Sequence, residues 1–455
     1  MTVGKVIVCA MNKILEPARH TPIISEVDVC VLGGSCTGTF AAIRAARRGL
    51  KVAIVEKQNR FGGVATCGLV CIWHNDLDDH YDEQIIAGLS LETVERLKRR
   101  DAVEVRERNP DARYVLNTEE LTIELDELIR EAEVKPFLHT MYCGAAIAED
   151  GRVEAVFIEN KDGRGAIRAQ VFIDATGDGD LAKDCQAPFT VQADLQPPTT
   201  CAKIAGLEGI NMRQFYNEHR DEFAVPKDAG WSCRIPGGAP VRVHAETHVF
   251  GANVADATQL TQAEMEGRRH IRAMMDMVRK HMPERREQLC LYDLSSSIGT
   301  RETRRFRAEH QLTEHELLYG HRFPDAIANG TYRVDIHYPE GGGHIFRYLD
   351  GREVSTRHDG KVWSRWRDEA DEYPLFYQIP YRSMVRRDCP NLIMAGRMID
   401  ADQGAYGAIR VMITMNQTGE AAGEAAALAL DGTPTWQVDP ATLRGQLKDG
   451  GSIIK

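Results

Sequence analysis

The sequence predicts an α/β fold that begins with a dinucleotide-binding unit, and three observations support this prediction. An apolar run over residues 27–32 ends in a glycine-rich turn, an alanine-rich helical segment covers residues 39–48, and a second apolar run over residues 51–55 ends at Glu56. This order of strand, tight turn, helix and strand with a terminal acid holds the ADP half of a dinucleotide in doubly wound proteins. The complete order favours a dinucleotide site over an ordinary α/β unit with a glycine loop.

The turn itself has the residues that such a site needs. Gly33 allows a sharp turn, and Gly38 allows the helix to pack closely against the strand. The helix start presents backbone N–H groups and a positive dipole end to a pyrophosphate. Glu56 stands 23 positions after Gly33, near the ~20 expected for an acid that binds ribose hydroxyls. Ser35 replaces the usual second glycine, and its hydroxymethyl group either crowds the pyrophosphate or donates a hydrogen bond to it.

Composition limits the partners and the compartment. The chain has 455 residues, of which 43% are hydrophobic, so it can bury a large core in two or three domains. A net charge of −11 and a pI near 5.8 argue against nucleic acid and anionic membranes as partners. No apolar run approaches the ~20 residues of a membrane span. Residues 6–11 are too short for a signal sequence and predict an extra strand or a docking arm. The 11 scattered cysteines suit reduced thiols and a cytoplasmic location.

The rest of the first third continues the α/β pattern. A polar loop after Glu56 closes on the doublet Gly62–Gly63. Apolar spacing predicts helices over residues 84–99 and 118–131, the second with Thr118 as N-cap. Strands are then predicted at residues 134–138, 141–148, 153–159 and 166–171, and a buried strand over 172–177 ends in glycine.

The middle of the chain has a different character, and the end returns to the first one. Residues 190–375 are rich in arginine and contain a long helical segment over 261–281, which predicts a second, mixed α/β domain. A strand at 391–396 and a helix over 408–430 with a small-residue face follow. We therefore expect an N-terminal arm (1–25), a nucleotide domain in two parts (26–190 and 376–435), an inserted substrate domain (191–375) and a C-terminal tail (436–455).

Several short motifs together carry a family resemblance over about residues 28–430. They are Val31–Gly34, Gly62–Thr66, Asp174–Asp180, Ile298–Arg304, Asp335–His337, Ile379–Arg382, Ala395–Arg397 and Arg410–Met412. With these motifs the chain resembles the FAD-dependent oxidoreductases whose nucleotide domain is of the glutathione reductase type. Within that group it is most similar to the branch named simply "FAD-dependent oxidoreductase".

The resemblance implies FAD as cofactor and names the residues that would hold it. Asp402 and the start of the long C-terminal helix would face the flavin ring, where a helix N-terminus stabilises negative charge on reduced flavin. The cofactor-binding residues that the resemblance implies are Gly33, Gly34, Ser35, Gly38, Glu56, Lys57, Gly62, Gly63, Thr176, Gly177, Asp178, Gly396, Arg397 and Asp402.

The predicted activity is hydride transfer between a small polar organic substrate and flavin N5, with reoxidation by oxygen, a quinone or a protein carrier. His337 or His74 is the candidate base, because a neutral histidine can take a proton while hydride leaves the adjacent carbon. His74 could instead anchor flavin covalently. Arg301 is the candidate for orienting substrate, with Arg304 and Arg410 as further arginines able to clamp a carboxylate. No metal-ligand spacing is present.

Two other functions stay open from the sequence. Cys67 and Cys71 predict, as one alternative, a flavin disulfide reductase. Two features depart from the pattern of such reductases: three residues rather than four separate the cysteines, and no second nucleotide-binding unit is visible in the sequence. A flavin-binding sensor without catalysis is the other. Residues 341–343 predict a glycine loop over the site. The substrate, the electron acceptor and the formation of a homo-oligomer cannot be read from the residues.

Overall fold

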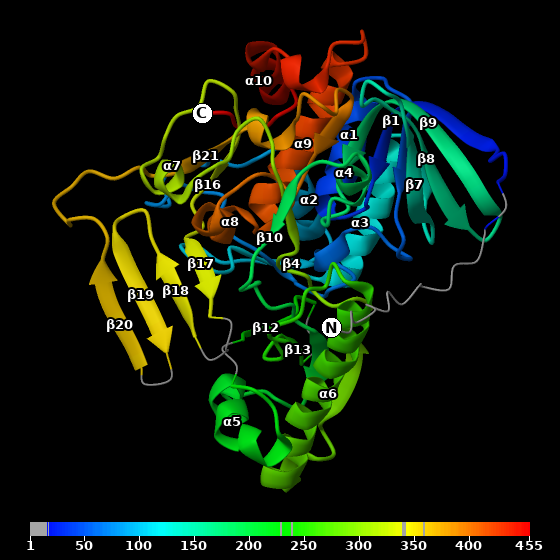
Figure 1. Ribbon diagram of the computed structural model, residues 1–455. Coiled ribbons are helices and arrows are strands. Elements are labelled where there is room, and N and C mark those ends of the chain that lie inside the picture. Colours follow the sequence, from blue (N-terminus) through cyan, green and yellow to red (C-terminus); the bar gives the residue numbers. More distant parts are fainter. Residues whose placement is uncertain (1–15, 17, 228–229, 238–239, 339–342, 358–359) are drawn as a thin grey trace, which may run out of the picture.

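A mixed sheet lies at the centre of the molecule and carries the predicted dinucleotide unit (Figure 1). The computed structural model describes residues 16, 18–227, 230–237, 240–338, 343–357 and 360–455. The strand order is β6 (Lys135–Phe137), β2 (Val52–Val55), β1 (Ile23–Leu32), β9 (Gly163–Asp174), β8 (Val153–Asn160) and β7 (Met141–Ile147), and β22 (Leu392–Met394) also pairs with β9.

The sheet joins distant parts of the sequence. β6, β2, β1, β9 and β22 run parallel, whereas β8 is antiparallel to β9 and β7 is antiparallel to β8. β9 is one strand of 12 residues, although the sequence predicted separate runs at 166–171 and 172–177. Its first half pairs with β8, and its last residues, Phe172 to Asp174, pair with β22. The C-terminal part of the chain thus returns to the first sheet at β22.

Two helices with small residues pack against each other beside this sheet. They are α1 (Cys36–Arg47) and α9 (Met412–Leu428), which appear blue and orange in Figure 1. A Cβ atom on Gly419 would lie 2.0 Å from the Thr37 carbonyl oxygen, and one on Gly423 would lie 2.4 Å from that of Ala41. The small-residue face predicted for the C-terminal helix is therefore the surface on which α1 packs.

Several helix boundaries differ from the sequence prediction. The helix expected over 84–99 begins only at α2 (Leu89–Lys98), because Gln84 pairs with Leu77 in a β-bridge and Gly88 has a φ of +68°. Asn117, rather than Thr118, caps α3 (Thr118–Glu131) by accepting from the N–H groups of Glu119 and Glu120. The helix expected over 408–430 is divided into α8 (Gln403–Ile409) and α9.

The described part of the middle region contains helices and two four-stranded antiparallel sheets. One sheet has the order β12 (Ser232–Arg234), β13 (Val241–His244), β11 (Ala202–Ala205), β14 (Cys290–Leu294), and it lies near α5 (Met212–His219) and α6 (Ala257–His281). The other has the order β17 (Val334–His337), β18 (His344–Arg347), β19 (Arg352–Arg357), β20 (Gly360–Arg365). This region contains both helices and strands, and the predicted division of the chain into domains stays a prediction.

The remaining elements are short. The strands are β3 (Ile72–Trp73), β4 (Val103–Val105), β5 (Tyr114–Leu116), β10 (Phe189–Val191), β15 (Arg304–Phe306), β16 (Ala326–Gly330) and β21 (Tyr377–Pro380). The helices are α4 (Asp180–Asp184), α7 (Glu314–Leu318) and α10 (Pro440–Asp449), with 3-10 turns at Gly63–Ala65, Arg220–Phe223, Pro283–Arg285, Tyr381–Met384 and Thr435–Gln437.

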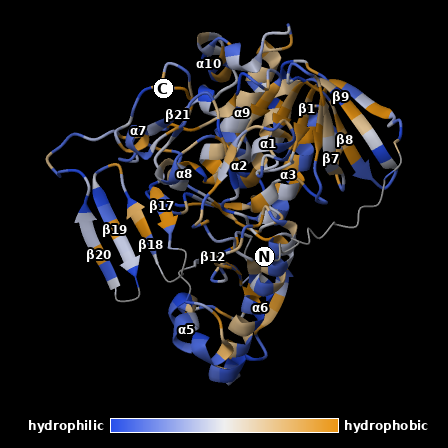
Figure 2. Ribbon diagram, in the orientation of Figure 1, coloured by the Kyte–Doolittle hydropathy of each residue, from blue (hydrophilic) through white to orange (hydrophobic). Residues whose placement is uncertain are grey.

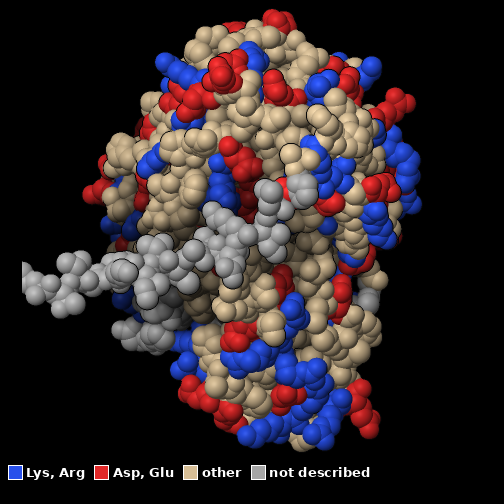
Figure 3. All heavy atoms as spheres, turned by 45° about the vertical axis from the view of Figure 1, so that its right-hand side comes forward, with Lys and Arg blue, Asp and Glu red and all other residues tan. Residues whose placement is uncertain are grey.

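Hydropathy and charge follow this architecture. The core strands around β1 are largely orange in Figure 2, whereas α5 is largely blue. Figure 3 shows acidic and basic side chains mixed over the upper part of the surface. Basic side chains gather at the lower end, where α5 and α6 lie in Figure 1. Within the described ranges, no helix is both long enough and apolar enough to cross a bilayer. The arm predicted at 6–11 lies outside the described residues, as do residues 341 and 342 of the predicted glycine loop.

Candidate functional site

A cavity of about 750 Å³ lies between the sheet, the middle region and the start of α9. It is called the central cavity below. Its volume lies in the range of ligand sites, roughly 300–1,000 Å³. The wall includes residues from the predicted nucleotide turn and residues from the predicted catalytic group. Predicted site residues that line it are Gly33, Ser35, Glu56, Lys57, Gly62, Gly63, His74, Thr176, Gly177, Asp178, Arg301, His337, Gly396 and Arg397.

The first turn approaches its neighbours so closely that only glycine fits. Gly33 has a φ of +95°, and a Cβ atom there would lie 2.4 Å from the Ala175 carbonyl oxygen. A Cβ atom on Gly38 would lie 1.9 Å from the Gly33 carbonyl oxygen. Gly38 does not line the cavity but stands behind the turn. The two glycines therefore bring the start of α1 against the end of β1, as the sequence predicted.

Ser35 has a different use from the two considered from sequence. Its Oγ accepts a hydrogen bond from the Gly38 N–H at 3.3 Å and caps α1. Ser35 also forms a parallel β-bridge with Gly62, and the Gly62 N–H donates to the Gly34 carbonyl at 2.7 Å. The glycine doublet thus lies beside the first turn, and both form one wall of the central cavity.

Glu56 is buried and held by backbone groups. One carboxylate oxygen accepts from the Gly34 N–H at 2.6 Å and the other from the Gln58 N–H at 2.8 Å. A carboxylate has about four lone-pair sites, so each oxygen keeps capacity for a ribose hydroxyl. Glu56 lines the cavity beside Lys57, in the position expected for the acid of a dinucleotide unit.

A second polar group closes the same end of the cavity. Asp178 accepts from Arg397 at 2.6 Å and from the Thr303 hydroxyl at 2.8 Å. Burial opposes ionisation of Asp178, but Arg397 and Thr303 outweigh it and lower the pKa of this carboxyl. Thr176 donates its N–H and its hydroxyl to buried Asp174. The segment after β9 is therefore held by the hydrogen bonds of Thr176 to Asp174 and by the contacts of Asp178 with Thr303 and Arg397.

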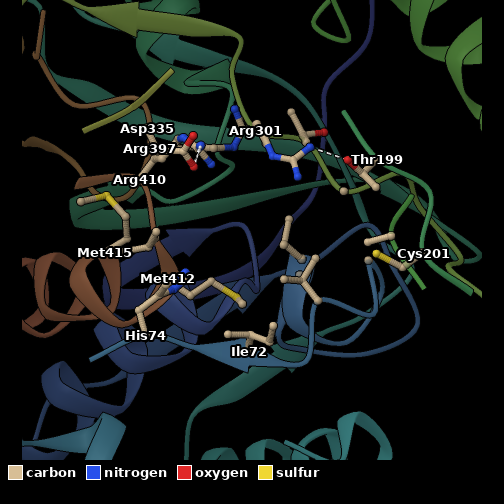
Figure 4. A pocket seen from close by; sticks show the side chains of 18 of the residues that line it. Ile72, His74, Thr199, Cys201, Arg301, Asp335, Arg397, Arg410, Met412 and Met415 are labelled. Carbon is tan, nitrogen blue, oxygen red and sulfur yellow. Dashed lines mark hydrogen bonds and ion pairs between the residues drawn. The ribbon is translucent and has the colours of Figure 1, made fainter. Parts of the chain in front are cut away.

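Histidines and arginines surround a buried carboxylate farther along the cavity. Asp335 accepts from the Tyr332 hydroxyl at 2.8 Å and from Arg410 at 2.9 Å, and its other oxygen lies 3.5 Å from His337 Nε2. Asp335, Arg397 and Arg410 lie together in Figure 4. The His337 ring lies 5.3 Å from that of His248 and 5.9 Å from that of His344, centre to centre.

His337, His74 and His344 are neutral near pH 7. Burial lowers the pKa of His337 well below 6.5, and it lowers the pKa of His74 and of His344 to about 4. The Asp335 carboxylate raises the pKa of all three but does not outweigh burial. His74 Nδ1 is buried and has no hydrogen-bond partner among the described residues. Neutral imidazoles facing a cavity can accept protons.

Arg301 lies near these histidines but is tied to the opposite wall. Its guanidinium donates to the Pro197 carbonyl at 2.6 Å and to the Thr199 hydroxyl, and the second contact is dashed in Figure 4. Arg304, by contrast, does not line the cavity, because it donates to the Asp178 carbonyl and to Asp180. Arg410 lines the cavity next to Asp335.

Some predicted residues lie outside the cavity wall. Asp402 caps α8 by accepting from the Ala405 N–H and also accepts from the Glu314 N–H, each at 2.8 Å, and it does not line the cavity. The start of α9 does, through Met412, Met415 and Asn416. Gly34 stands behind the turn, as Gly38 does. Their predicted contacts with a cofactor stay predictions.

Sequence reasoning missed Thr303, Tyr332 and Arg333. Thr303 lies inside the 298–304 motif, and Tyr332 and Arg333 come just before the 335–337 motif, so a search of residues flanking each motif could have found them. Arg333 stacks on Phe346 at 3.9 Å from the ring centre and pairs with Asp111. Tyr332 and Arg333 complete the polar wall around Asp335, whereas Thr303 holds Asp178.

Cys67 and Cys71 do not pair with each other. The Cys71 Sγ lies 3.2 Å from the Cys233 Sγ, whereas the Cys67 Sγ lies 4.0 Å from the Thr66 hydroxyl oxygen. The geometry therefore gives the Cys67–Cys71 alternative no support.

Among the described residues, His219, Glu222 and His281 come close enough to hold a metal ion, but Lys280 already donates to Glu222 at 2.6 Å.

The residues present fit the FAD that the resemblance implies. Gly33 and Gly63 line the cavity at points where a Cβ would contact backbone or Ser35. Glu56 keeps acceptor capacity, and the N-terminus of the 17-residue helix α9 faces the cavity with no side-chain cap. A cavity whose wall contains both a glycine turn and a helix start suits a dinucleotide.

Comparison with known proteins places the chain in a family. Similar solved structures include a geranylgeranyl bacteriochlorophyll reductase-like protein from Thermoplasma acidophilum (13% identity, TM-score 0.44, 93% of this chain and 84% of that chain). The flavin-dependent brominase Bmp2 (11%, 0.44, 94% and 84%) and the p-nitrophenol 4-monooxygenase PnpA from Pseudomonas putida DLL-E4 (10%, 0.39, 90% and 79%) are others. No curated protein matches the chain. The family model described as FAD dependent oxidoreductase matches residues 28–447, and the chain therefore belongs to the FAD-dependent oxidoreductases, with FAD as its cofactor.

Proposed function

We propose that the protein oxidises or reduces a small polar organic substrate in the central cavity. FAD, when bound, supplies the two-electron acceptor or donor at flavin N5. The observation that carries the proposal is that one cavity contains both the dinucleotide turn and the group of His337, Asp335 and Arg410. Oxygen, a quinone or a protein carrier is the proposed second partner.

His337 is the proposed base of the reaction. It lines the cavity, is neutral near pH 7 and lies 3.5 Å from Asp335, which would stabilise the imidazolium that forms when a substrate proton is taken. His74 is the second candidate, because its Nδ1 is buried in the wall without a protein partner. The two histidines come from different segments and can be tested separately.

Arg301 and Arg410 are proposed to position the substrate. Both line the cavity, and the Arg410 guanidinium has a buried Nε without a hydrogen-bond partner among the described residues. An arginine forms paired hydrogen bonds with carboxylate oxygens or stabilises a developing alkoxide. A substrate with an oxygen-bearing polar group beside the reacting carbon fits this arrangement best.

An absorbance spectrum of the purified protein, before and after acid precipitation, tests cofactor content and attachment together. Flavin absorbance in the supernatant indicates non-covalent FAD. Flavin that stays with the precipitated protein indicates covalent attachment, for which His74 is the candidate. Anaerobic bleaching with a panel of hydroxy and amino compounds then tests for substrate. If no donor bleaches the oxidised flavin and the reduced flavin passes electrons to no acceptor, the result would favour the non-catalytic sensor.

The base is tested by His337→Asn. We expect the rate of flavin bleaching to fall by about 10²–10⁴-fold while the flavin spectrum of the protein stays unchanged. His20→Asn is the matched control, because His20 is exposed and outside the cavity. An unchanged rate in His337→Asn together with a large loss in His74→Asn would move the role to His74.

A further inference from the structure

Two cysteines from separate parts of the chain meet beside the central cavity. Cys71 precedes β3 in the predicted nucleotide domain, and Cys233 lies in β12 in the predicted substrate domain. Their Sγ atoms are 3.2 Å apart, and both side chains are buried, Cys71 with no exposed area and Cys233 with 3%. The surroundings are apolar, since both belong to a core cluster with Val115, Val243 and Ala245.

The two sulfur atoms are not equivalent. Cys233 lines the cavity, whereas Cys71 does not. Either sulfur can be the donor of the hydrogen bond between them. Donation from Cys71, with the nearby Arg106 and Arg242, lowers the pKa of Cys233 despite burial. The same contact and burial raise the pKa of Cys71. Burial also raises the pKa of Cys67 and of Cys201, the other cysteines near the pair. Cys233 is therefore the more readily deprotonated of the two thiols and the one that lines the cavity, as a nucleophilic sulfur must.

We propose that Cys233 and Cys71 form a peroxide-reactive dithiol site in the wall of the central cavity. A hydroperoxide enters through the cavity, and the Cys233 thiolate attacks its distal oxygen, so that the O–O bond breaks and Cys233 becomes a sulfenic acid. The leaving oxygen departs as water or an alcohol after it takes a proton. The Cys71 thiol then attacks the Cys233 sulfur, the S–S bond forms, and the hydroxyl leaves as water.

The electrons balance without any other reactant. Two thiols lose one electron and one proton each, and hydrogen peroxide gains both electrons and both protons to give two waters. Formation of the S–S bond, about 2.05 Å long, requires the sulfur atoms to approach by roughly 1 Å, which side-chain rotation and small shifts of β12 can supply. The bond would link the wall beside the glycine doublet to the predicted substrate domain.

The test treats the purified flavoprotein with hydrogen peroxide, blocks the remaining thiols and maps disulfides in non-reducing tryptic digests. Cys233 falls in a peptide of its own, residues 228–234, whereas residues 61–96 form one peptide with both Cys67 and Cys71. The Cys67→Ser variant resolves this ambiguity. We expect a linkage between the two peptides in the wild type and in Cys67→Ser, and its loss in Cys71→Ser. The exposed Cys143 and Cys290 serve as internal references for unpaired thiols.

Dimedone, which traps sulfenic acids, tests the order of the steps. In Cys71→Ser we expect the adduct on Cys233, because the resolving thiol is absent. In Cys233→Ser we expect no adduct on Cys71. The proposal would be overturned if peroxide oxidised Cys143 and Cys290 in the wild type but linked Cys233 to no other cysteine. This result comes from the wild-type protein alone, so it does not depend on the folding of a variant. Cys185 and Cys389 form a second pair of hydrogen-bonded thiols. A linkage confined to that pair, or one between Cys67 and Cys71, would overturn the proposal as well.

Discussion

Asp335 sets the charge balance on the histidine side of the central cavity. Burial opposes ionisation of this carboxyl, but His337, Arg410 and Arg333 outweigh burial and lower its pKa. Asp335 is therefore an anion, and it stabilises positive charge on its neighbours. His337 is nevertheless neutral near pH 7, because its own burial has the larger effect on its pKa. One buried anion thus holds Arg410 in place and leaves His337 free to accept a proton.

This arrangement predicts a displaced acid limb in the pH profile. The base works when neutral, so the rate falls only where the pH falls below the pKa of His337, and burial has moved that pKa well below 6.5. We expect kcat/KM to stay constant from pH 7 through 6.5 and to decline at lower pH. Asp335→Asn removes the charge that raises the pKa of His337, so its acid limb should move to still lower pH.

The measurement is the rate of flavin bleaching by substrate across a pH series. An acid limb at or above pH 6.5 would contradict the role of His337 as a buried base. A limb near pH 4 that persists in His337→Asn would instead indicate His74, whose pKa burial lowers to about 4. Flavin content measured at each pH separates loss of catalysis from loss of cofactor.

Residue identities were predictable from sequence, but residue uses were less so. Gly33, Gly38 and Glu56 could be named because spacing along a strand–turn–helix unit determines where they must lie. The capping role of Ser35 could not, because it depends on the direction of one hydroxyl toward the Gly38 N–H. The inward position of Tyr332 depends likewise on the fold of β17 and its neighbours around Asp335.

At the scale of elements, the junction of α1 with β1 gives a direct test of the dinucleotide turn. A methyl group added at Gly38 would lie 1.9 Å from the Gly33 carbonyl oxygen. Because that carbonyl belongs to the turn that lines the cavity, the turn must shift. We expect Gly38→Ala to lose most of its FAD and about 1–3 kcal/mol of unfolding free energy. Flavin absorbance per chain and urea denaturation measure the two effects.

Gly445 provides the matched control. It lies inside helix α10, and a Cβ atom there would meet nothing within 4 Å. Gly445→Ala should therefore keep its FAD and gain about 0.5–1 kcal/mol, the difference in helix propensity between the two residues. Equal FAD content in the two variants would show that the close approach at Gly38 is not needed for cofactor binding.

Element boundaries followed sequence where local signals agreed with tertiary contacts. The helix at 118–131 matched because apolar spacing, an Asn cap and acidic residues in the first turn all favour it. The helix predicted at 84–99 started too early because Ile85 and Ile86 fit its apolar spacing. The bridge of Gln84 with Leu77 and the hydrogen bonds from both isoleucine N–H groups to the Asp76 carbonyl keep this segment out of the helix. Nothing local marks the break between α8 and α9, since neither glycine nor proline stands at 410–411.

At the scale of the whole molecule, the site depends on contacts between distant parts of the sequence. Sequence motifs indicated that the C-terminal part returns to the first sheet, and the pairing of β22 with β9 agrees with this. The meeting of Cys71 with Cys233 could not be foreseen, because 162 positions separate them and no periodicity relates them. The same applies to the buried ion pair between α1 and α9.

That ion pair carries the last prediction. Arg44 of α1 and Glu420 of α9 are 4% and 1% exposed in their side chains, and Arg44 Nε donates to Glu420 at 3.0 Å. Glu420 also accepts from the Leu89 N–H at 3.1 Å, so it joins three helices. Glu420→Gln removes the nearer anion of buried Arg44 and leaves only Glu424, at 3.9 Å, so we expect a loss of about 3–5 kcal/mol in unfolding free energy.

A second pair from α1 offers a control of the same chemistry at the surface. Arg47 pairs with Glu92 of α2 at 2.7 Å, and the two side chains are 37% and 33% exposed. Because solvent screens this pair, Glu92→Gln should cost only about 0–1 kcal/mol. Urea denaturation followed by tryptophan fluorescence compares the variants, and flavin content reports whether the cavity survives. If Glu420→Gln were as stable as Glu92→Gln, then the buried pair of Arg44 and Glu420 would add nothing to the stability that the close glycine and alanine packing of α1 on α9 provides.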